Sequence, residues 1–281
     1  MTNKTILITG CSSGIGLCVA KGLHQRGWRV FATARRDEDL ARLQELGITA
    51  IYLELTDPNS IQQAVTTILE QTDGQLDALF NNAAYGQPGA VEDLSREALK
   101  AQFETNLFGT HELTRLILPV MRRQGYGRII SNSSVLGFVA LPFRGAYNAS
   151  KFALEGLTDT LRLELRGSGI HLSLIEPGPI SSSFRDNAHA MFKRYIDVEH
   201  SVHHDSYLGM ERRLQKPGPA APFTLPPEAV LKKVIHALEH PRPRIRYYVT
   251  VPTWLFATIR HFLSYRAMDR LLGRVSNDEN R

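Results

Sequence analysis

The sequence predicts an α/β fold, in which a doubly wound parallel sheet lies between two layers of helices within one domain. Two observations lead to this prediction. Through the first 180 residues, short runs rich in β-branched residues alternate with helix-like stretches, which is the pattern of βαβ units. In addition, the stretch TILITGCSSGIG (5–16) passes from a strand through a glycine-rich turn directly into a helix.

Six strands and five helices follow from this alternation. The expected strands are residues 5–9, 29–33, 48–53, 76–81, 127–134 and 170–176. The expected helices lie near 15–27, 37–46, 58–73, 96–124 and 145–167. One helix start is well marked, because Asp57 suits the N-cap and Pro58 suits the first helical position. After residue 180 the chain becomes rich in loops, and residues 215–228 indicate turns before a later helix.

The charge of the chain is unevenly distributed. Residues 1–184 carry 17 basic and 18 acidic side chains, whereas residues 185–281 carry 16 and 10, with seven of the ten histidines. No nucleic-acid-binding motif accompanies this basic excess, so we expect no nucleic-acid partner. An anionic lipid surface or an anionic substrate stays open.

The ends and the cysteines indicate the compartment. A strand pattern that begins at Lys4 leaves no room for a signal peptide or transit sequence. The two cysteines, Cys11 and Cys18, lie in one loop-to-helix segment, which argues against a disulfide framework. We therefore expect a cytoplasmic protein in a reducing environment.

The first turn predicts a dinucleotide site. Gly10, Gly14 and Gly16 permit a tight turn and a close approach to a pyrophosphate, whose charge suits the N-terminus of the next helix. The alternative is that these glycines only pack the helix against the sheet.

The end of the second strand indicates which dinucleotide binds. An acidic residue there favours NAD, whereas an arginine accommodates the 2′-phosphate of NADP. This strand is followed by Arg35 and Arg36, with the first acid at Asp37. The alternative is that both arginines pair with Asp37, Glu38 and Asp39. We expect NADP(H), because arginine recognises phosphate well.

Tyr147 and Lys151 lie four residues apart, on one face of a predicted helix. Together with T-G-x-x-x-G-x-G (Thr9–Gly16) and NNAA (81–84), this Y-x-x-x-K spacing resembles the short-chain dehydrogenase/reductase family, in its single-domain oxidoreductase branch. The resemblance covers roughly residues 3–185 and implies a Rossmann-like fold. FRGAYNASKFALEGL and RPRIRYYV are most similar to the hydroxysteroid and retinol dehydrogenase group.

The resemblance implies catalytic roles for four residues. Tyr147 would give a proton to a carbonyl that is reduced, or take one from an alcohol that is oxidised. Because a free phenol titrates near pH 10, its pKa needs lowering by about 2–3 units, and Lys151 would supply the positive charge and bond the nicotinamide ribose. Ser134 would orient the substrate oxygen, with Ser133 as the neighbouring alternative. Asn106 would hold a water in the proton relay, although alone it is better explained as a buried amide at a helix kink.

The resemblance also implies a set of cofactor contacts. The glycine turn would bind the phosphates, Asn81 and Ala83 would border the adenosine ribose, and Glu54 and Leu55 would flank the adenine. The cofactor set is Gly10, Ser12, Ser13, Gly14, Ile15, Gly16, Arg35, Arg36, Glu54, Leu55, Asn81, Ala83, Tyr147, Lys151, Pro177, Gly178, Ile180 and Ser182. Ala84 replaces a glycine that is usual in the family, and Ser13 stands where NADP users often have Lys or Arg. The expectation of NADP(H) therefore depends on Arg35, with Arg36 as a second candidate.

In the family, a substrate lid follows the nicotinamide segment, here at 183–225. This range contains an apolar set that suits a hydrophobic substrate, although core packing explains each member alone: Phe184, Met191, Phe192, Tyr195, Tyr207, Leu208 and Met210. His200, His203 and His204 lack supporting ligand spacing, and we expect no metal.

The tail, residues 249–281, combines apolar residues with Arg266, Arg270 and Arg274 at four-residue spacing. Its uninterrupted apolar length is far below the ~20 residues that span a bilayer. Three roles stay open: a cover over the substrate pocket, a subunit contact, and weak peripheral contact with an anionic membrane surface.

These observations predict an NADP(H)-dependent oxidoreductase acting on the CH–OH group of a hydrophobic carbonyl/alcohol pair, such as a steroid, a retinoid or a long-chain aldehyde, in the reducing direction. The alternative is an NADP(H)-binding redox sensor without turnover, which has no need of Asn106, Ser134, Tyr147 and Lys151. Because many relatives assemble through long helices like those at 96–124 and 145–167, we also expect a homodimer or homotetramer.

Overall fold

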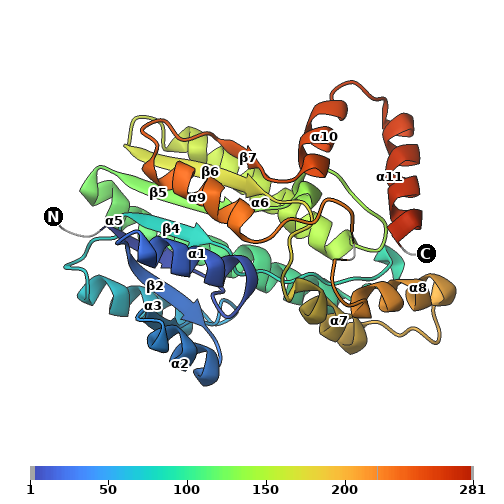
Figure 1. The fold of residues 1–281 in the computed structure, drawn as a ribbon, viewed down its shortest axis with the longest axis horizontal. Coiled ribbons are helices and arrows are strands. Elements are labelled where there is room, and N and C mark those ends of the chain that lie inside the picture. Colours follow the sequence, from blue (N-terminus) through green and yellow to red (C-terminus); the bar gives the residue numbers. More distant parts are fainter. Residues whose placement is uncertain (1–3, 220, 280–281) are drawn as a thin grey trace.

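The central sheet has seven parallel strands in the order β3-β2-β1-β4-β5-β6-β7 (Figure 1). The computed structural model describes residues 4–219 and 221–279. The strands are β1 (Thr5–Ile8), β2 (Arg29–Ala34), β3 (Thr49–Tyr52), β4 (Ala78–Asn81), β5 (Gly127–Asn132), β6 (Ile170–Glu176) and β7 (Arg246–Tyr248). The chain starts mid-sheet, builds outwards to β3, and then returns to build from β4 to β7. The predicted doubly wound sheet is confirmed, with one strand more than the sequence predicts.

The side chains of β1 alternate between the two faces of the sheet, as a pleated strand requires. Ile6 and Ile8 lie in a core shared with α1 (Gly14–Gln25), α2 (Asp37–Glu45) and α9 (Glu228–Glu239). Leu7 lies in the opposite core, shared with α3 (Pro58–Glu70), α5 (Thr110–Gln124) and α6 (Gly145–Glu164). Because helices cover both faces, the central strands are nearly continuous apolar runs, which makes them easy to recognise in the sequence.

The strand order reverses between β1 and β4, which are neighbours in the sheet. In open α/β sheets, ligands bind outside the carboxyl ends of the strands at such a switch point. The glycine-rich turn follows β1, and the NNAA segment spans the end of β4. The two motifs are therefore brought together at the carboxyl ends of the central strands.

The helix predicted over 96–124 is interrupted. It consists of α4 (Arg96–Phe103), a π-helical segment η2 (Glu104–Gly109) and α5. At Gly109 the helix passes so close to the loop after β3 that a Cβ atom would lie 2.0 Å from the Leu55 carbonyl oxygen. The π-helical segment accommodates an extra residue at this crowded place, and it contains the buried Asn106.

Beyond β6 the chain forms a helical region beside the sheet. The helices α7 (Phe184–Tyr195) and α8 (His204–Gln215) build a small core of their own with Ala90. Next to Ala90, η1 (Val91–Asp93) carries Asp93, which accepts hydrogen bonds from Tyr207 and from Ser201. The strand β7 has three residues among arginines and no apolar run, which explains why the sequence pattern does not predict it.

The tail forms a hairpin of two helices, α10 (Val251–Ile259) and α11 (Tyr265–Glu279), which stands at one end of the molecule (Figure 1). Phe256 of α10 and Leu272 of α11 are buried against η3 (Val135–Gly137) and Val139. Tyr147 packs at the edge of the same cluster. Within residues 4–219 and 221–279, no helix is long and apolar enough to cross a membrane.

Candidate active site

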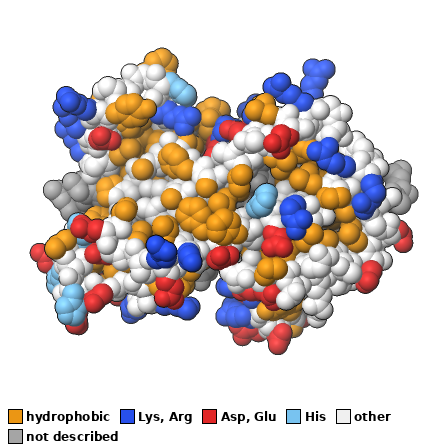
Figure 2. All heavy atoms as spheres, turned by 180° about the vertical axis from the view of Figure 1, so that it is seen from behind, with side chains coloured by type: hydrophobic (Ala, Val, Ile, Leu, Met, Phe, Trp, Pro, Cys, Tyr) orange, Lys and Arg blue, Asp and Glu red, His pale blue; other side chains and the backbone are white. Residues whose placement is uncertain are grey.

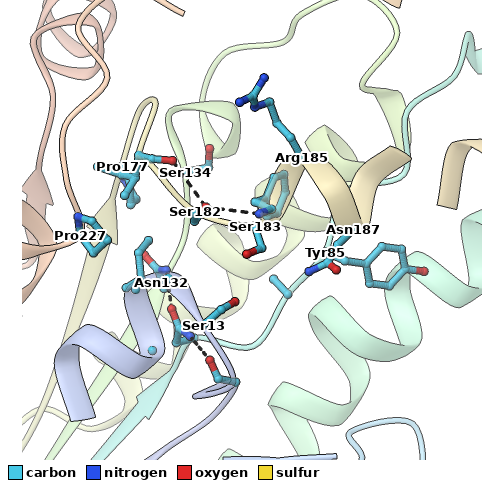
Figure 3. Close-up of a pocket in the computed structure, with 18 of the residues that line it drawn as sticks. Ser13, Tyr85, Asn132, Ser134, Pro177, Ser182, Ser183, Arg185, Asn187 and Pro227 are labelled. Atoms are coloured by element: carbon cyan, nitrogen blue, oxygen red, sulfur yellow. Dashed lines mark hydrogen bonds between the residues drawn. The ribbon is translucent and has the colours of Figure 1, made fainter. Parts of the chain in front are cut away.

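A cavity of about 1780 Å³ opens at the carboxyl ends of the central strands. Seventeen of the predicted site residues line it: Gly10, Ser12, Ser13, Gly14, Ile15, Gly16, Arg35, Glu54, Leu55, Ala83, Ser134, Tyr147, Lys151, Pro177, Gly178, Ile180 and Ser182. Figure 3 shows part of this wall, with Ser13, Asn132, Ser134 and Ser182 among the labelled residues. Arg36, Asn81 and Asn106 lie outside the lining.

The glycine-rich turn leaves the N-terminus of α1 open to the cavity. Gly14 has a left-handed φ of +54°, and a Cβ atom there would lie 2.8 Å from Ser182 Cβ. At Gly16 a Cβ atom would lie 2.1 Å from the Gly10 carbonyl oxygen. The N-cap residue, Ser13, makes no side-chain hydrogen bond to the helix. The first N–H groups of α1 are therefore free of a side-chain cap and suit an anion such as a pyrophosphate.

The two arginines after β2 have different surroundings. Arg35 lines the cavity and pairs with Glu54 at 3.1 Å, its side chain being 67 % exposed. Arg36 pairs with Glu38 and Asp39, both at 2.8 Å. For this arginine the alternative interpretation, in which it pairs with the acids at the start of the next helix, is therefore the one that the structure shows. Burial opposes ionisation of Glu54, but hydrogen bonds from Thr56 and Arg35 hold its pKa below the usual value. Arg35 is thus the arginine at the cavity.

Arg42 of α2 is a third basic residue near this end of the cavity, and the sequence pattern does not reveal it. Its guanidinium donates to the Ser12 carbonyl oxygen and to Asp39, the latter at 2.7 Å. Because Ser12 lines the cavity, Arg42 adds positive charge beside the glycine turn.

A hydrogen-bond network joins the loops after β1, β4 and β5. The Asn82 side chain donates to the carbonyl oxygens of Thr9 and Gly10, at 2.9 and 3.2 Å. The Asn132 side chain in turn donates to Asn82 Oδ1 at 3.0 Å. Asn82 and Asn132 both line the cavity, although neither is in the predicted set.

The predicted contact at Asn81 is replaced by one at its neighbour. Asn81 is the last residue of β4, and its side chain donates to Thr114 Oγ1 of α5 at 2.9 Å, on the far side of the sheet. Alternation along the strand sends the next residue, Asn82, to the cavity. The NNAA motif alone does not indicate which of its two asparagines faces the ligand.

Tyr147, Ser134 and Lys151 meet on the cavity wall. The Ser134 hydroxyl accepts from the Leu136 N–H at 3.1 Å, and it is close enough to the Tyr147 phenol to influence its pKa. Lys151 is 3 % exposed, and its Nζ donates to the Asn132 carbonyl oxygen at 2.7 Å. It also lies 5.7 Å from the centre of the Tyr147 ring. The three side chains are therefore held in one place by neighbouring backbone groups.

The pKa of Tyr147 differs from the expectation. Desolvation of the half-buried phenol raises the pKa of Tyr147 to about 12, while the neighbouring Ser134 hydroxyl lowers it. Lys151 is not among the groups that set this pKa, and its Nζ donates to the Asn132 carbonyl oxygen. Burial also lowers the pKa of Lys151 to about 8, against the raising effect of Glu155. The residues of the site keep Tyr147 protonated, as a proton donor requires.

Asn106 lies outside the cavity lining and forms hydrogen bonds with residues next to it. Its Oδ1 accepts from the Tyr85 N–H at 3.1 Å, while its Nδ2 donates to the Tyr85 carbonyl oxygen and to Ser150 Oγ. Ser150 Oγ donates to the Tyr147 carbonyl oxygen at 2.9 Å. This buried amide in a π-helical segment agrees with the kink interpretation, and it also links η2 to the helix of Tyr147.

The predicted lid residues divide into two groups. Phe184, Met191 and Tyr195 line the cavity, and the Phe184 ring meets that of Tyr147 edge-on at 5.4 Å. Phe192, Tyr207 and Met210 lie instead in the small core of the α7–α8 region, and Leu208 is exposed.

His203 pairs with Glu92 at 2.6 Å and His200 with Asp197 at 2.9 Å. In the part of the chain that the structure describes, no group of three or more His, Cys, Asp or Glu residues is arranged to hold a metal.

A buried ionic cluster lies next to Lys151. The Arg246 guanidinium contacts Glu155, Glu176 and Asp159, the last at 2.5 Å. Glu176 is fully buried, and one of its oxygens is contacted by the Arg246 guanidinium. Burial raises the pKa of Glu176 to about 8, a change that the Glu155 charge reinforces and Arg246 opposes. Glu176 therefore keeps its proton at neutral pH.

Glu176 should make stability depend on pH. Its folded pKa of about 8 lies above the usual value of 4.5. The protonation of Glu176 therefore contributes fully to the free energy of unfolding below pH 4.5, and this contribution is lost as the pH rises to 8. The slope is at most about −1.4 kcal/mol per pH unit. We expect urea unfolding between pH 5 and 8 to show a flatter pH dependence for Glu176→Gln than for the wild type. Equal slopes in the two proteins would contradict the neutral state of Glu176.

The chain is similar to known oxidoreductases over most of its length. The family model described as short chain dehydrogenase matches residues 4–192. The uncharacterized oxidoreductase YbbO of Escherichia coli K12 is 42 % identical, over 96 % of this chain and 94 % of that protein. Human 17-beta-hydroxysteroid dehydrogenase type 1 is 34 % identical, over 89 % and 78 %, and human retinol dehydrogenase 8 is 34 % identical, over 86 % and 80 %.

Solved structures agree. A short-chain dehydrogenase from Streptomyces avermitilis superposes with a TM-score of 0.78, at 30 % identity over 98 % of both chains. One from Burkholderia phymatum in complex with NAD gives 0.77, at 26 % identity over 96 % and 95 %. The closed form of serine dehydrogenase with NADP+ gives 0.74, at 25 % identity over 89 % and 95 %.

Proposed function

Because the chain belongs to the short-chain dehydrogenase/reductase family, we propose that it is an NADP(H)-dependent reductase of hydrophobic carbonyl compounds. The observation that carries this proposal is the meeting of Ser134, Tyr147 and Lys151 on the wall of a cavity whose other end is the glycine-rich turn. A proton donor and a dinucleotide cradle then share one space, as hydride transfer needs.

The residues of the wall have separate tasks. Ser134 and Tyr147 would both hydrogen-bond the substrate oxygen, and Tyr147 would pass its proton to that oxygen during reduction. Lys151, while protonated, would favour the tyrosinate left behind. The glycine turn and the uncapped start of α1 fit a pyrophosphate, and NADPH, when bound, supplies the hydride. Asn132 and Asn106 would keep Lys151 and the helix of Tyr147 in place.

The preference for NADP(H) rests on basic charge at the adenosine end. Arg35 lines the cavity, Arg42 reaches the neighbouring Ser12, and the segment between β2 and α2 begins without an acid. Solved relatives include complexes with NAD and with NADP+, so we base the choice on these residues. An arginine pair suits a 2′-phosphate, whereas an NAD site needs a carboxylate for the 2′-hydroxyl.

Part of the substrate end of the cavity is apolar. Its lining includes Leu141, Met191, Tyr195, Leu255 and Phe256. Such a lining favours a large hydrophobic molecule with a single polar group near Ser134 and Tyr147. Relatives named for a steroid and for retinol support this class of substrate.

Reduced Cys11 and Cys18 agree with a cytoplasmic location.

The proposal is tested by the loss of NADPH absorbance with long-chain aldehydes, retinal and steroid ketones, each also run with NADH. We expect turnover with at least one of these apolar carbonyls and a higher kcat/KM with NADPH. Small hydrophilic aldehydes serve as the comparison. Turnover confined to those small aldehydes would contradict the assignment of the substrate class.

We further propose that the tail covers the substrate end. Val275 of α11 lines the cavity, and Leu272 is buried against Phe256. Removal of residues 264–281 should therefore raise KM for apolar substrates about tenfold, because a buried apolar side chain contributes about 1.5–3 kcal/mol, with a smaller effect on kcat. Arg270→Ala, on the exposed side of α11, is the control. Unchanged KM in the truncated, folded protein would exclude this role.

The loop between α10 and α11 is the part of the tail that suits a weak membrane contact. Phe262 and Tyr265 are 82 % and 90 % exposed, and Arg260 and Arg266 lie beside them. Aromatic tips with basic neighbours suit the surface of an anionic bilayer. Co-sedimentation with phosphatidylserine vesicles, which Phe262→Ser with Tyr265→Ser should reduce, tests this contact.

For the oligomer, the face of α5 and α6 is the natural contact. Figure 2 shows hydrophobic side chains gathered over the middle of this side of the molecule. Exposed apolar residues include Phe108 just before α5 and Phe152, Leu157 and Leu163 on α6. We propose a homodimer or homotetramer through these helices, which light scattering on the wild type and on Phe152→Lys would test.

A further inference from the structure

The stripe of α6 that carries Tyr147 and Lys151 continues with charged residues beyond the cavity. Glu155 and Asp159 follow at the same four-residue spacing, so the four side chains lie along one side of the helix. Glu155 is buried, at 6 % exposure, and the reaction proposed above does not use it. A buried carboxylate one turn from a buried lysine calls for a physical reason, because burial of unpaired charge is costly.

Glu155 is held from outside the helix. Arg246, at the start of the edge strand β7, contacts Glu155 Oε2 and Glu176 Oε1 with one nitrogen and Asp159 with the other. A single guanidinium thus joins two turns of α6 to β6. Since Glu176 keeps its proton, the positive charge of Arg246 is left to balance Glu155 and Asp159, and Asp159 has a second partner in Arg162 at 3.3 Å.

The other oxygen of Glu155 is directed to the cavity side of the cluster. Among the described residues, neither Glu155 Oε1 nor Ser133 Oγ has a hydrogen-bond partner. A Cβ atom placed on Gly137 would lie 2.8 Å from the first and 2.5 Å from the second, so both oxygens border the same small space. Ser133 lines the cavity next to Ser134. The Oε1 atom of Glu155, which has no hydrogen-bond partner among the described residues, therefore lies close to the part of the cavity wall formed by Ser133 and Ser134.

Lys151 is surrounded by few charges. Its Nζ donates to the Asn132 carbonyl oxygen of β5 and lies over the Tyr147 ring, and Glu155 follows one turn later on the same helix. Beyond Glu155 lie the protonated Glu176 of β6 and Arg246 of β7. Burial lowers the pKa of Lys151, and the charge of Glu155 raises it. Glu155 is thus the group that opposes the loss of the lysine proton.

We propose that Glu155, held in place by Arg246, is a positioning residue that keeps Lys151 protonated through the pH range in which the enzyme works. This inference rests on the proposed function, since Lys151 matters only if Tyr147 transfers a proton. It assigns a role in the reaction to β7, the strand at the edge of the sheet, through a contact between residues 91 positions apart.

The test replaces charge with little change of shape. In Glu155→Gln the lysine loses its anion, so the alkaline fall of kcat should move about half to one unit to lower pH. Activity near pH 6 should stay close to that of the wild type. Arg246→Met should act in the same direction, because Glu155 then loses the guanidinium that holds its carboxylate in place. Asp159→Asn, which also contacts Arg246 but lies one turn farther from Lys151, should leave the profile in place.

A second readout does not depend on turnover. Lysine-selective NMR of the cofactor-free protein, with Lys151→Arg to assign the signal, gives the pKa of Lys151 directly. We expect it to fall in Glu155→Gln and to stay within about 0.3 unit in Asp159→Asn. A folded Glu155→Gln protein whose Lys151 titrates as in the wild type would overturn the inference. Because this titration needs no substrate, it tests the effect of Glu155 on Lys151 even if the reductase assay fails.

Discussion

Replacement of Tyr147 by phenylalanine should lower kcat by about 10³-fold, within the 10²–10⁴ range of a lost proton donor. The phenol and the Ser134 hydroxyl are neighbours on the cavity wall, and desolvation keeps the phenol protonated. Phenylalanine preserves the ring contact with Phe184 but removes the proton. Steady-state kinetics with the best apolar carbonyl measures the effect.

The control is the binding of NADPH, which should not change. Lys151 keeps its bond to the Asn132 carbonyl oxygen, and the glycine turn is untouched. Tyr195→Phe, at another lining tyrosine on α7, should alter KM more than kcat. If Tyr147→Phe retained more than a tenth of the wild-type kcat, another group would have to donate the proton.

Replacement of Arg35 by alanine should raise KM for NADPH about ten- to a hundredfold, the usual loss for a hydrogen bond to a charged group. Arg35 is the arginine that lines the cavity, and its guanidinium is held at Glu54 by an exposed pair. KM for NADH should change little, since NADH lacks the 2′-phosphate. Initial rates with the two cofactors give the change in preference.

Arg36→Ala is the matched control for this prediction. The adjacent side chain has the same charge, but it pairs with Glu38 and Asp39 and lies outside the cavity lining. We expect less than a threefold change in KM for either cofactor. A larger loss of NADPH affinity in Arg36→Ala than in Arg35→Ala would show that the 2′-phosphate is read by the other arginine.

The sequence predicts the local features of this protein well. The glycine turn, Tyr147 with Lys151, and six strands depend on spacing within one or two elements, so their patterns are visible in the chain. The buried strands stand out because helices cover both faces of the sheet. Even the kink at Asn106 follows from its position in one helix.

Features that depend on contacts between distant elements are not visible in the sequence. Asn82 rather than Asn81 faces the cavity, because the Asn81 side chain is directed to Thr114 of α5 on the other side of the sheet. Arg35 and Arg36 have the same chemistry, and only the turn after β2 separates their surroundings. The contact of Arg246 with Glu155 crosses from α6 to a three-residue strand. The pKa of Tyr147 follows from burial, which no spacing reveals.

The measurement that tests the central claim most directly is deuterium transfer from NADPH labelled at C4 of the nicotinamide. The wild-type protein is incubated with the labelled cofactor and an apolar aldehyde or ketone, and the product is analysed by mass spectrometry. We predict an alcohol that is heavier by one deuterium on the former carbonyl carbon, and formation of this product about 10³-fold more slowly with Tyr147→Phe. Tight NADPH binding without deuterium in any product would contradict the account and indicate a cofactor-binding sensor.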